Sequence, residues 1–351
     1  MFRTARSLRV PVFLSLCLVL TLFIPRQRAR ADELEQAAKK EGELRIVVYP
    51  SLEPLGEAFQ KKYGIKVEGM YVGEPPIVRK VSQESDAGIF AVDIFTTSTG
   101  PAGSTLNKWA LAYNPAGFDK VADLKKTLPA DWNQIPLFNN VVGVVYNSDL
   151  LPHNQAPKSI YDLLKPEFKG KIISRTPWLG SNFLTEILSY DAWFGRDMKK
   201  WEDYWRRFKQ NVGRYEPEFP TIHTAVGLKE FSLGVFTLSW TSTLYGRSYP
   251  ALAFSTFKES GIWWPNMAAI HTKAPHPNAA KLFVNFLVSE EGQKYFADGG
   301  MIPARKDMPV KAELKQALEG IKLNNNLQNI LIKELDEKEA EWKARVQKIF
   351  R

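Results

Sequence analysis

Cysteine is almost absent from this sequence of 351 residues, and its single copy, Cys17, lies in an apolar run near the N-terminus. The remaining chain can therefore form no disulfide and offers no thiol nucleophile. The sequence also contains no P-loop, no H-E-x-x-H motif, no G-x-S-x-G elbow and no paired Cys and His at metal-ligand spacing. These absences argue against an enzyme of the common hydrolase, metalloenzyme and nucleotide-dependent classes.

Long apolar runs are equally scarce, and the one that approaches membrane length covers residues 10–24. Three arginines precede this run, and the small-x-small sequence Ala29-Arg30-Ala31 follows it. This order is typical of a secretory signal peptide, which we expect to cover residues 1–31 and to be removed on export. The alternative is a membrane anchor, but a run of about 15 residues is short for a span, which needs roughly 20.

Outside residues 1–31, positive charge is not concentrated in any one part of the sequence. Residues 1–31 contain six arginines and no acidic residue, so their removal lowers the formal net charge from +9 to +3. Nucleic-acid binding requires a clustered basic face, and a small net charge spread over the remaining chain does not indicate one. We therefore expect no nucleic-acid partner, whereas a small anionic ligand is compatible with this charge.

The first part of the chain alternates between apolar strands and amphipathic helices. Strands are expected at residues 44–49, 65–71 and 92–95, and the polar residues 96–100 are expected to form a loop. The helix after the first strand has an apolar face between Leu55 and Tyr63 and is expected to end at Gly64. Such alternation predicts an α/β fold with a mostly parallel sheet, whose ligands bind beyond the carboxyl ends of the strands.

The second part of the chain repeats this pattern, and its length favours two lobes over one core. Strands are expected at residues 140–147, 171–175, 234–240 and 262–270. Helices are expected at residues 157–165 and from Phe183 onward, and a helix capped by Pro277-Asn278 and a charged helical tail are expected after the last strand. The first and last of these strands are interpreted as crossings between the lobes. This predicts lobe one at 32–140 and 262–310, lobe two at 141–261, and a tail at 311–351.

Several segments carry a family resemblance. The sequence from Pro157 to Ile172, P-K-S-I-Y-D-L-L-K-P-E-F-K-G-K-I, closely resembles a segment of periplasmic solute-binding proteins of ABC importers, in particular the ferric-iron-binding-like branch. Further segments resemble this family in the same order, at residues 37–44, 58–67, 145–147, 279–293 and 299–307. The resemblance implies a type II periplasmic-binding-protein clamp, in which two lobes are joined by crossing strands.

The resemblance also implies a function without catalysis. A protein of this family captures a small solute by hinge closure and delivers it to an ABC permease in the inner membrane, and we expect it to act as a monomer. Enzymes that share this architecture, such as thiaminase-type enzymes and porphyrin-precursor deaminases, depend on a cysteine that residues 32–351 lack. A sensor subunit that presents its ligand to a membrane receptor is an alternative that the sequence leaves open.

Candidate binding residues follow the predicted strands, where small polar side chains meet helix starts. Each of them could instead serve only as a turn or cap residue. On lobe one they are Tyr49, Ser51, Thr97 and Ser98; on lobe two they are Arg175, Thr176, Ser181, Trp240, Thr241, Ser242 and Tyr245.

The same positions bear on whether the solute is a metal. Iron-binding members of the family use two adjacent tyrosines after a lobe-two strand, where this chain has Trp240-Thr241-Ser242-Thr243. Tyr245 and Tyr249 lie nearby but are not adjacent, and the four histidines show no ligand spacing. We therefore predict no metal and no cofactor, and expect an organic or phosphorus-containing oxyanion as solute. Ferric iron remains the alternative.

Overall fold

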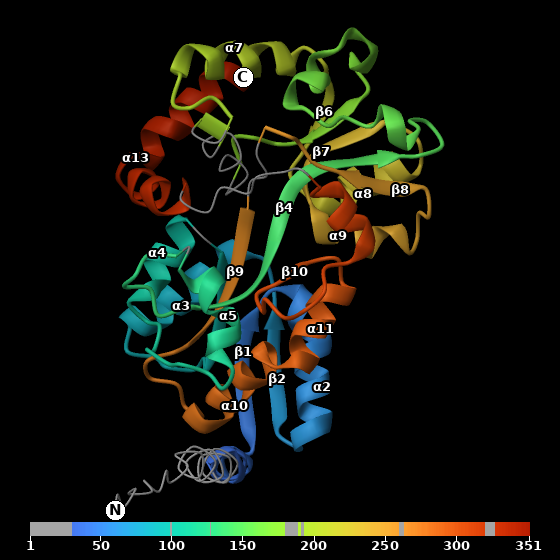
Figure 1. Ribbon diagram of the computed structural model, residues 1–351. Helices are drawn as coiled ribbons and strands as arrows, with labels where there is room; N and C mark the ends of the chain where they lie inside the picture. Colours follow the sequence, from blue (N-terminus) through green and yellow to red (C-terminus); the bar gives the residue numbers. More distant parts are fainter. Residues whose placement is uncertain are drawn as a thin grey trace, which may run out of the picture.

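The fold is organised around β4 (Ile135–Asn147), which is buried along its whole length. The computed structural model describes residues 30–98, 100–126, 128–179, 189–190, 193–259, 263–319 and 327–351, with the backbone alone at 122, 124, 263–264 and 327–336. The first half of β4 pairs with β9 (Trp263–Ile270) and β10 (Ile302–Pro303). Its second half pairs with β7 (Leu233–Leu238) and β8 (Leu252–Ser255), so one strand belongs to both halves of the molecule (Figure 1).

The half below the crossing in Figure 1 contains a parallel group of strands next to β9. Here β1 (Glu43–Val48) lies between β2 (Lys66–Tyr71) and β3 (Ile94–Ser98), and β3 pairs antiparallel with β9. A helix at residues 30–41 precedes β1. The other helices are η1 (Pro50–Leu52), α2 (Glu53–Tyr63), α3 (Glu74–Asp86), α4 (Pro101–Asn107), α5 (Phe118–Lys125), α10 (Pro277–Val288) and α11 (Glu290–Asp298).

The other half has a second parallel group, in which β5 (Ile172–Arg175) lies between β6 (Val212–Glu216) and β7. Its helices are η2 (His153–Gln155), η3 (Ile160–Leu164), η4 (Pro166–Phe168), α7 (Met198–Lys209), α8 (Phe219–Gly227) and α9 (Ser239–Gly246), followed at the C-terminus by α12 (Ala312–Ala317) and α13 (Leu327–Phe350). The predicted α/β clamp with crossing strands is confirmed. Among the described residues, no helix has both the length and the apolarity to cross a membrane.

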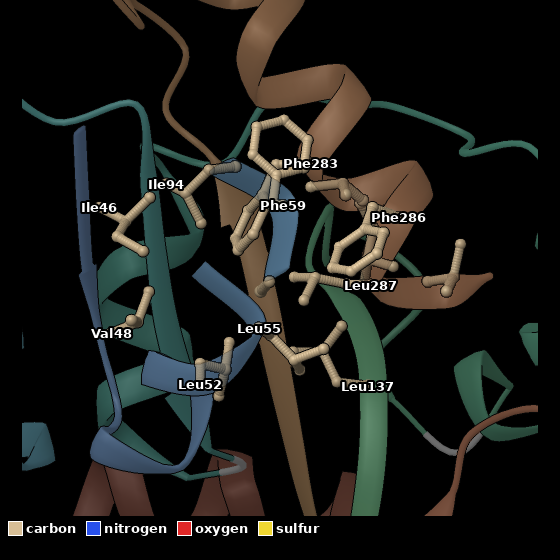
Figure 2. Close-up of a cluster of buried hydrophobic side chains, with 14 of the residues drawn as sticks. Ile46, Val48, Leu52, Leu55, Phe59, Ile94, Leu137, Phe283, Phe286 and Leu287 are labelled. Atoms are coloured by element: carbon tan, nitrogen blue, oxygen red, sulfur yellow. The ribbon is translucent and has the colours of Figure 1, made fainter. Parts of the chain in front are cut away.

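The core of the first half forms where α2 and α10 cover the sheet (Figure 2). Phe59 of α2 packs against Phe283 and Phe286 of α10, with ring centroids 5.0 and 5.8 Å apart. The apolar face predicted for α2 is therefore the face that is buried. The helix ends at Gly64, whose φ of 71° is a left-handed conformation that glycine adopts without a Cβ clash.

The core of the second half is aromatic and includes the end of the chain. Trp201 and Trp205 of α7 are fully buried. Trp342 of α13 lies 5.6 Å from Trp201, and Phe350 lies 5.7 Å from Trp205, between ring centroids. The charged helical tail predicted from the sequence therefore ends within this aromatic core.

Three local predictions need correction. Residues 157–165 form no α-helix but the 3₁₀ turn η3, which starts with a capping box between Ser159 and Asp162. A loop is predicted at residues 96–100, but residues 96–98 belong to β3, because the pairing of β3 with β9 extends to Ser98. Strand β7 ends at Leu238, so the predicted strand residues 239–240 begin α9 instead.

The helix predicted from Phe183 and the signal peptide up to residue 29 lie outside the described residues.

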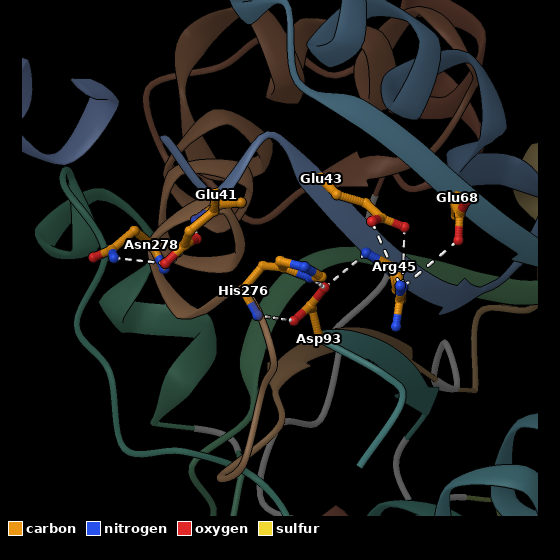
Figure 3. A network of polar contacts seen from close by, with 8 residues as sticks. Glu41, Glu43, Arg45, Glu68, Asp93, His276 and Asn278 are labelled. Carbon is orange, nitrogen blue, oxygen red and sulfur yellow. Dashed lines mark hydrogen bonds and ion pairs between the residues drawn. The ribbon is translucent and has the colours of Figure 1, made fainter. Parts of the chain in front are cut away.

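Buried polar contacts join α10 to the start of the sheet (Figure 3). The Asp93 carboxylate is fully buried and accepts hydrogen bonds from the backbone N–H groups of Arg45 at 2.7 Å and His276 at 2.6 Å. Glu41 accepts from the backbone N–H groups of Asn278 and Ala279 at 3.0 and 2.7 Å. The cap of α10 is therefore Glu41, from far away in the sequence, and not the predicted Pro277-Asn278.

Replacing Asp93 by Asn should lower the free energy of unfolding by about 2–4 kcal/mol, because charge-assisted bonds to buried N–H groups are weakened and one donor loses its acceptor. Urea denaturation measures this difference. Asp86→Asn is the control, since Asp86 is 57% exposed and pairs with Lys108 at the surface, and its loss should cost under about 0.5 kcal/mol. Equal effects of the two substitutions would contradict this account of the network.

Candidate functional site

The strand register brings the strand ends of both halves to the same part of β4. Ser98, at the end of β3, pairs with Asn266 of β9, which pairs with Phe138 of β4. Leu238, at the end of β7, pairs with Val142 of β4. These two β4 positions are four residues apart, or about 13 Å at roughly 3.3 Å per residue. The carboxyl ends of the parallel strands in each half therefore lie on either side of the crossing point.

Glu74 is the centre of the polar contacts on the lobe-one side. One oxygen of its carboxylate, Oε1, accepts a hydrogen bond from the Tyr49 hydroxyl at 2.7 Å. The same oxygen accepts from the Ser98 N–H at 2.8 Å and from the Ser98 hydroxyl at 2.6 Å. Two predicted residues are thus brought together by a third residue that the sequence analysis missed. Its only signal in the sequence is an acidic residue at a helix start.

The Tyr49 hydroxyl acts as a donor in this group. Burial, together with the negative charge of Glu74 beside it, raises the pKa of Tyr49 well above its ordinary value. The phenol therefore keeps its proton at physiological pH. The backbone N–H of Tyr49 also donates to Thr96 Oγ1 at 3.0 Å, which ties the end of β1 to β3.

The other two predicted residues of lobe one take different positions. Thr97 is fully buried, and its hydroxyl lies 2.9 Å from the Ser98 carbonyl and 3.2 Å from Gln134 Oε1. Ser51 lies half-buried in η1, directly after the end of β1. Thr97 is therefore engaged inside lobe one, whereas the donors of Tyr49 and Ser98 meet at Glu74.

On the lobe-two side, Arg175 is the last residue of β5. Because Ser174 pairs with Val235, Arg175 lies close to the end of β7 and hence to the crossing point. Its guanidinium lies over the ring of Phe219, 4.3 Å from the centroid. Thr176 is buried and continues the strand pairing through its N–H, which donates to the Glu216 carbonyl at 2.9 Å. Ser181 lies outside the described residues.

The remaining predicted residues lie on α9. Trp240 packs against the hydrophobic cores of both halves. Thr241 is fully buried, and its hydroxyl donates to the Leu238 carbonyl at 2.6 Å, which makes it part of the helix start. Tyr245 stacks on His223 of α8, with ring centroids 4.8 Å apart. Of these residues, Trp240 is the one that touches both lobes.

Ser242 lines a cavity of about 580 Å³ between α9, β8 and α12. Its hydroxyl is buried and has no hydrogen-bond partner among the described residues. The cavity is also lined by Lys311 and Glu313 at its α12 side, but not by Tyr49, Ser98 or Arg175. It is therefore separate from the polar groups at the crossing point.

The geometry around Tyr245 and Tyr249 bears on metal binding. Tyr245 stacks on His223, and the ring of Tyr249 lies against Gly227, where an added Cβ would meet it at 2.4 Å. Both rings are thus held by α8. In the described part of the chain, no three His, Cys, Asp or Glu residues are grouped as they would be around a metal ion.

His223 should make the stability of the protein depend on pH. Burial lowers the pKa of His223 from 6.5 to about 4. Above pH 6.5 the imidazole is neutral in both the folded and the unfolded chain, but between 6.5 and 4 the unfolded chain binds a proton that the folded chain does not. Stability is therefore lost as the pH falls through this window, by about 2 kcal/mol at pH 5.

Urea denaturation at pH 7.5 and pH 5.0 measures this effect. His223→Phe, which keeps a ring against Tyr245, should lose less stability between the two pH values than the wild type. His153→Gln is the control, because the His153 side chain is exposed. An unchanged pH dependence in His223→Phe would show that His223 does not cause this loss of stability.

Two α/β lobes that share the strand β4, with polar strand ends near the crossing point, are typical of two-lobed solute-binding proteins. Residues 103–333 match the family described as bacterial extracellular solute-binding protein. The chain belongs to this family, which confirms the predicted resemblance and the predicted class of function, the binding of a solute. No curated protein matches this sequence closely enough to count as a relative.

Solved structures share the fold at low sequence identity. Iron-bound HitA from Pseudomonas aeruginosa is 19% identical with a TM-score of 0.69, and the match covers 87% of this chain and 99% of HitA. AfuA from Actinobacillus pleuropneumoniae, with bound fructose-6-phosphate, is 18% identical with a TM-score of 0.67, covering 86% and 99%. An ABC-transporter substrate-binding protein from Agrobacterium tumefaciens is 18% identical with a TM-score of 0.68, covering 88% and 94%. These structures support the fold, while their different ligands show that the fold alone does not determine the solute.

Proposed function

We propose that this protein is the periplasmic substrate-binding component of an ABC importer and that it captures a small organic or phosphorus-containing oxyanion. The observation that supports the proposal is the position of Arg175 at the end of β5, on the lobe-two side of the β4 crossing where strand ends of both halves approach each other. A guanidinium is always charged and binds carboxylate or phosphate oxygens with paired N–H donors. The export signal expected at residues 1–31 supports the periplasmic location.

Binding and delivery would proceed by hinge closure. The solute first contacts one open lobe, and bending of the crossing strands at residues 141–146 and 264–270 then brings the other lobe onto it. Because the ligand gains contacts to both lobes only in the closed form, it stabilises that form by the free energy of those additional contacts. A permease in the inner membrane would accept the solute from the closed, monomeric protein. No catalytic step is part of this function.

Ferric iron is the second candidate solute, and its support is the shared fold with iron-bound HitA. The packing of Tyr245 and Tyr249 against α8 argues against it, because phenolate oxygens would be needed as ligands for a hard ion. A ligand-presenting sensor is the second candidate role. Genes for a permease and an ATPase next to the gene for this protein would favour import.

Arg175→Ala should weaken binding of the natural solute by about 10- to 100-fold, because hydrogen bonds to a charged group usually contribute that much to affinity. Native mass spectrometry of protein purified from the periplasm without a metal-affinity tag first identifies the bound solute. Isothermal titration calorimetry with that compound then measures the affinity of each variant. The expected adduct is a small carboxylate, phosphonate or phosphate ester.

Arg214→Ala provides a matched control. Arg214 also lies over an aromatic ring, that of Phe231 at 5.0 Å, but it pairs with Ile173 in the middle of the strand and is engaged with Glu230 at 3.3 Å. Its replacement should leave the affinity unchanged. An iron adduct with a visible absorption band, or equal affinity in the wild type and Arg175→Ala, would refute the oxyanion proposal.

A further inference from the structure

The donors at the lobe-one strand ends are already used by Glu74. The Tyr49 hydroxyl, the Ser98 N–H and the Ser98 hydroxyl each have one proton to donate, and all three are directed at Glu74 Oε1. Glu74 is 25 and 24 residues away from Tyr49 and Ser98 in sequence, so these are tertiary contacts and not a local helix cap. These donors are therefore not available to the oxyanion of a solute, because the Glu74 carboxylate already accepts from them.

The start of α3 is also a poor anion site. A helix N-terminus attracts anions through its free N–H groups. In α3 the second and third residues are Pro75 and Pro76, which have no N–H, and the N-cap Gly73 has no side chain. Glu74 itself adds a negative charge at the first helical position. Both features make this end of lobe one unfavourable for a bare phosphate or carboxylate.

The Glu74 carboxylate still has capacity to accept. Its hydrogen bonds all fall on Oε1, and Oε2 accepts none from the residues that the structure describes. The side chain is only half-buried, and within the described residues it forms no ion pair with Lys, Arg or His. A partly desolvated, unpaired carboxylate next to a binding site is a receptor for a cation or for a hydroxyl donor.

We propose that Glu74 makes lobe one selective for the ammonium or hydroxyl end of a bipolar solute, whose oxyanion is bound by Arg175 on lobe two. The solute class is thus a short amino- or hydroxyl-substituted phosphonate, phosphate ester or carboxylate. This inference rests on the proposed function and narrows its substrate. Opposite charges on the two lobes also fix the direction in which such a solute enters the clamp.

Pairs of ligands that differ only at the donor end test this inference. The probes are 3-aminopropylphosphonate with butylphosphonate, glycerol 3-phosphate with propyl phosphate, and 3-aminopropanoate with butanoate, measured by thermal shift and calorimetry on the full mature chain. In the wild type, the donor-bearing member of a pair should bind at least about 10-fold more tightly. Glu74→Gln keeps the oxygen that accepts from Tyr49 and Ser98 but removes the charge, so this preference should largely disappear for the ammonium ligands.

Glu57→Gln is the matched control, because it removes the same charge from an exposed side chain of the same lobe; it should retain the preference. If both members of each pair bind equally well, in the wild type and in Glu74→Gln, the proposed role of Glu74 is wrong. The proposed binding of an oxyanion would not be contradicted by that result. Failure of the wild type to bind any member of the three pairs would overturn the proposed solute class, and this inference with it.

Discussion

The structure depends on the burial and continuous pairing of β4. Every residue of this strand is buried, and its backbone pairs with strands of lobe one through its first half and of lobe two through its second. A buried backbone must satisfy its hydrogen bonds, so this pairing leaves little freedom for slippage between the halves. The positions of Ser98 and Leu238 relative to each other follow from this register. The site is thus determined by the strand that joins the lobes.

The polar groups near the crossing differ in sign between the two sides. Lobe one has a carboxylate, Glu74, held by donors from β1 and β3, and lobe two has the guanidinium of Arg175 at the end of β5. A clamp with opposite charges on its two faces favours a solute with complementary ends, and closure brings each end to its partner. Trp240 packs against both cores and therefore lies where the two lobes meet.

Much of the fold could be predicted because periodicity and turn residues are local signals. The face of α2, its end at Gly64 and the strands β1 to β5, β7 and β9 follow from spacing. The short strands β6, β8 and β10 were not predicted. Glu74 and Glu41 could not be predicted, since each gains its role from partners 24 or more residues away. Likewise, the sequence of residues 239–240 looks like a continuation of β7, but the helix α9 begins at Ser239. Packing of α9 against β8 and α8 decides where β7 ends.

Small-angle X-ray scattering of the mature protein, with and without its solute at saturation, tests the central claim that the solute is held between lobes that share β4. The account predicts a smaller radius of gyration with solute bound and no change when solute is added to a variant that cannot bind it. Identical scattering of the free and saturated protein, with binding verified by calorimetry in the same sample, would contradict the clamp.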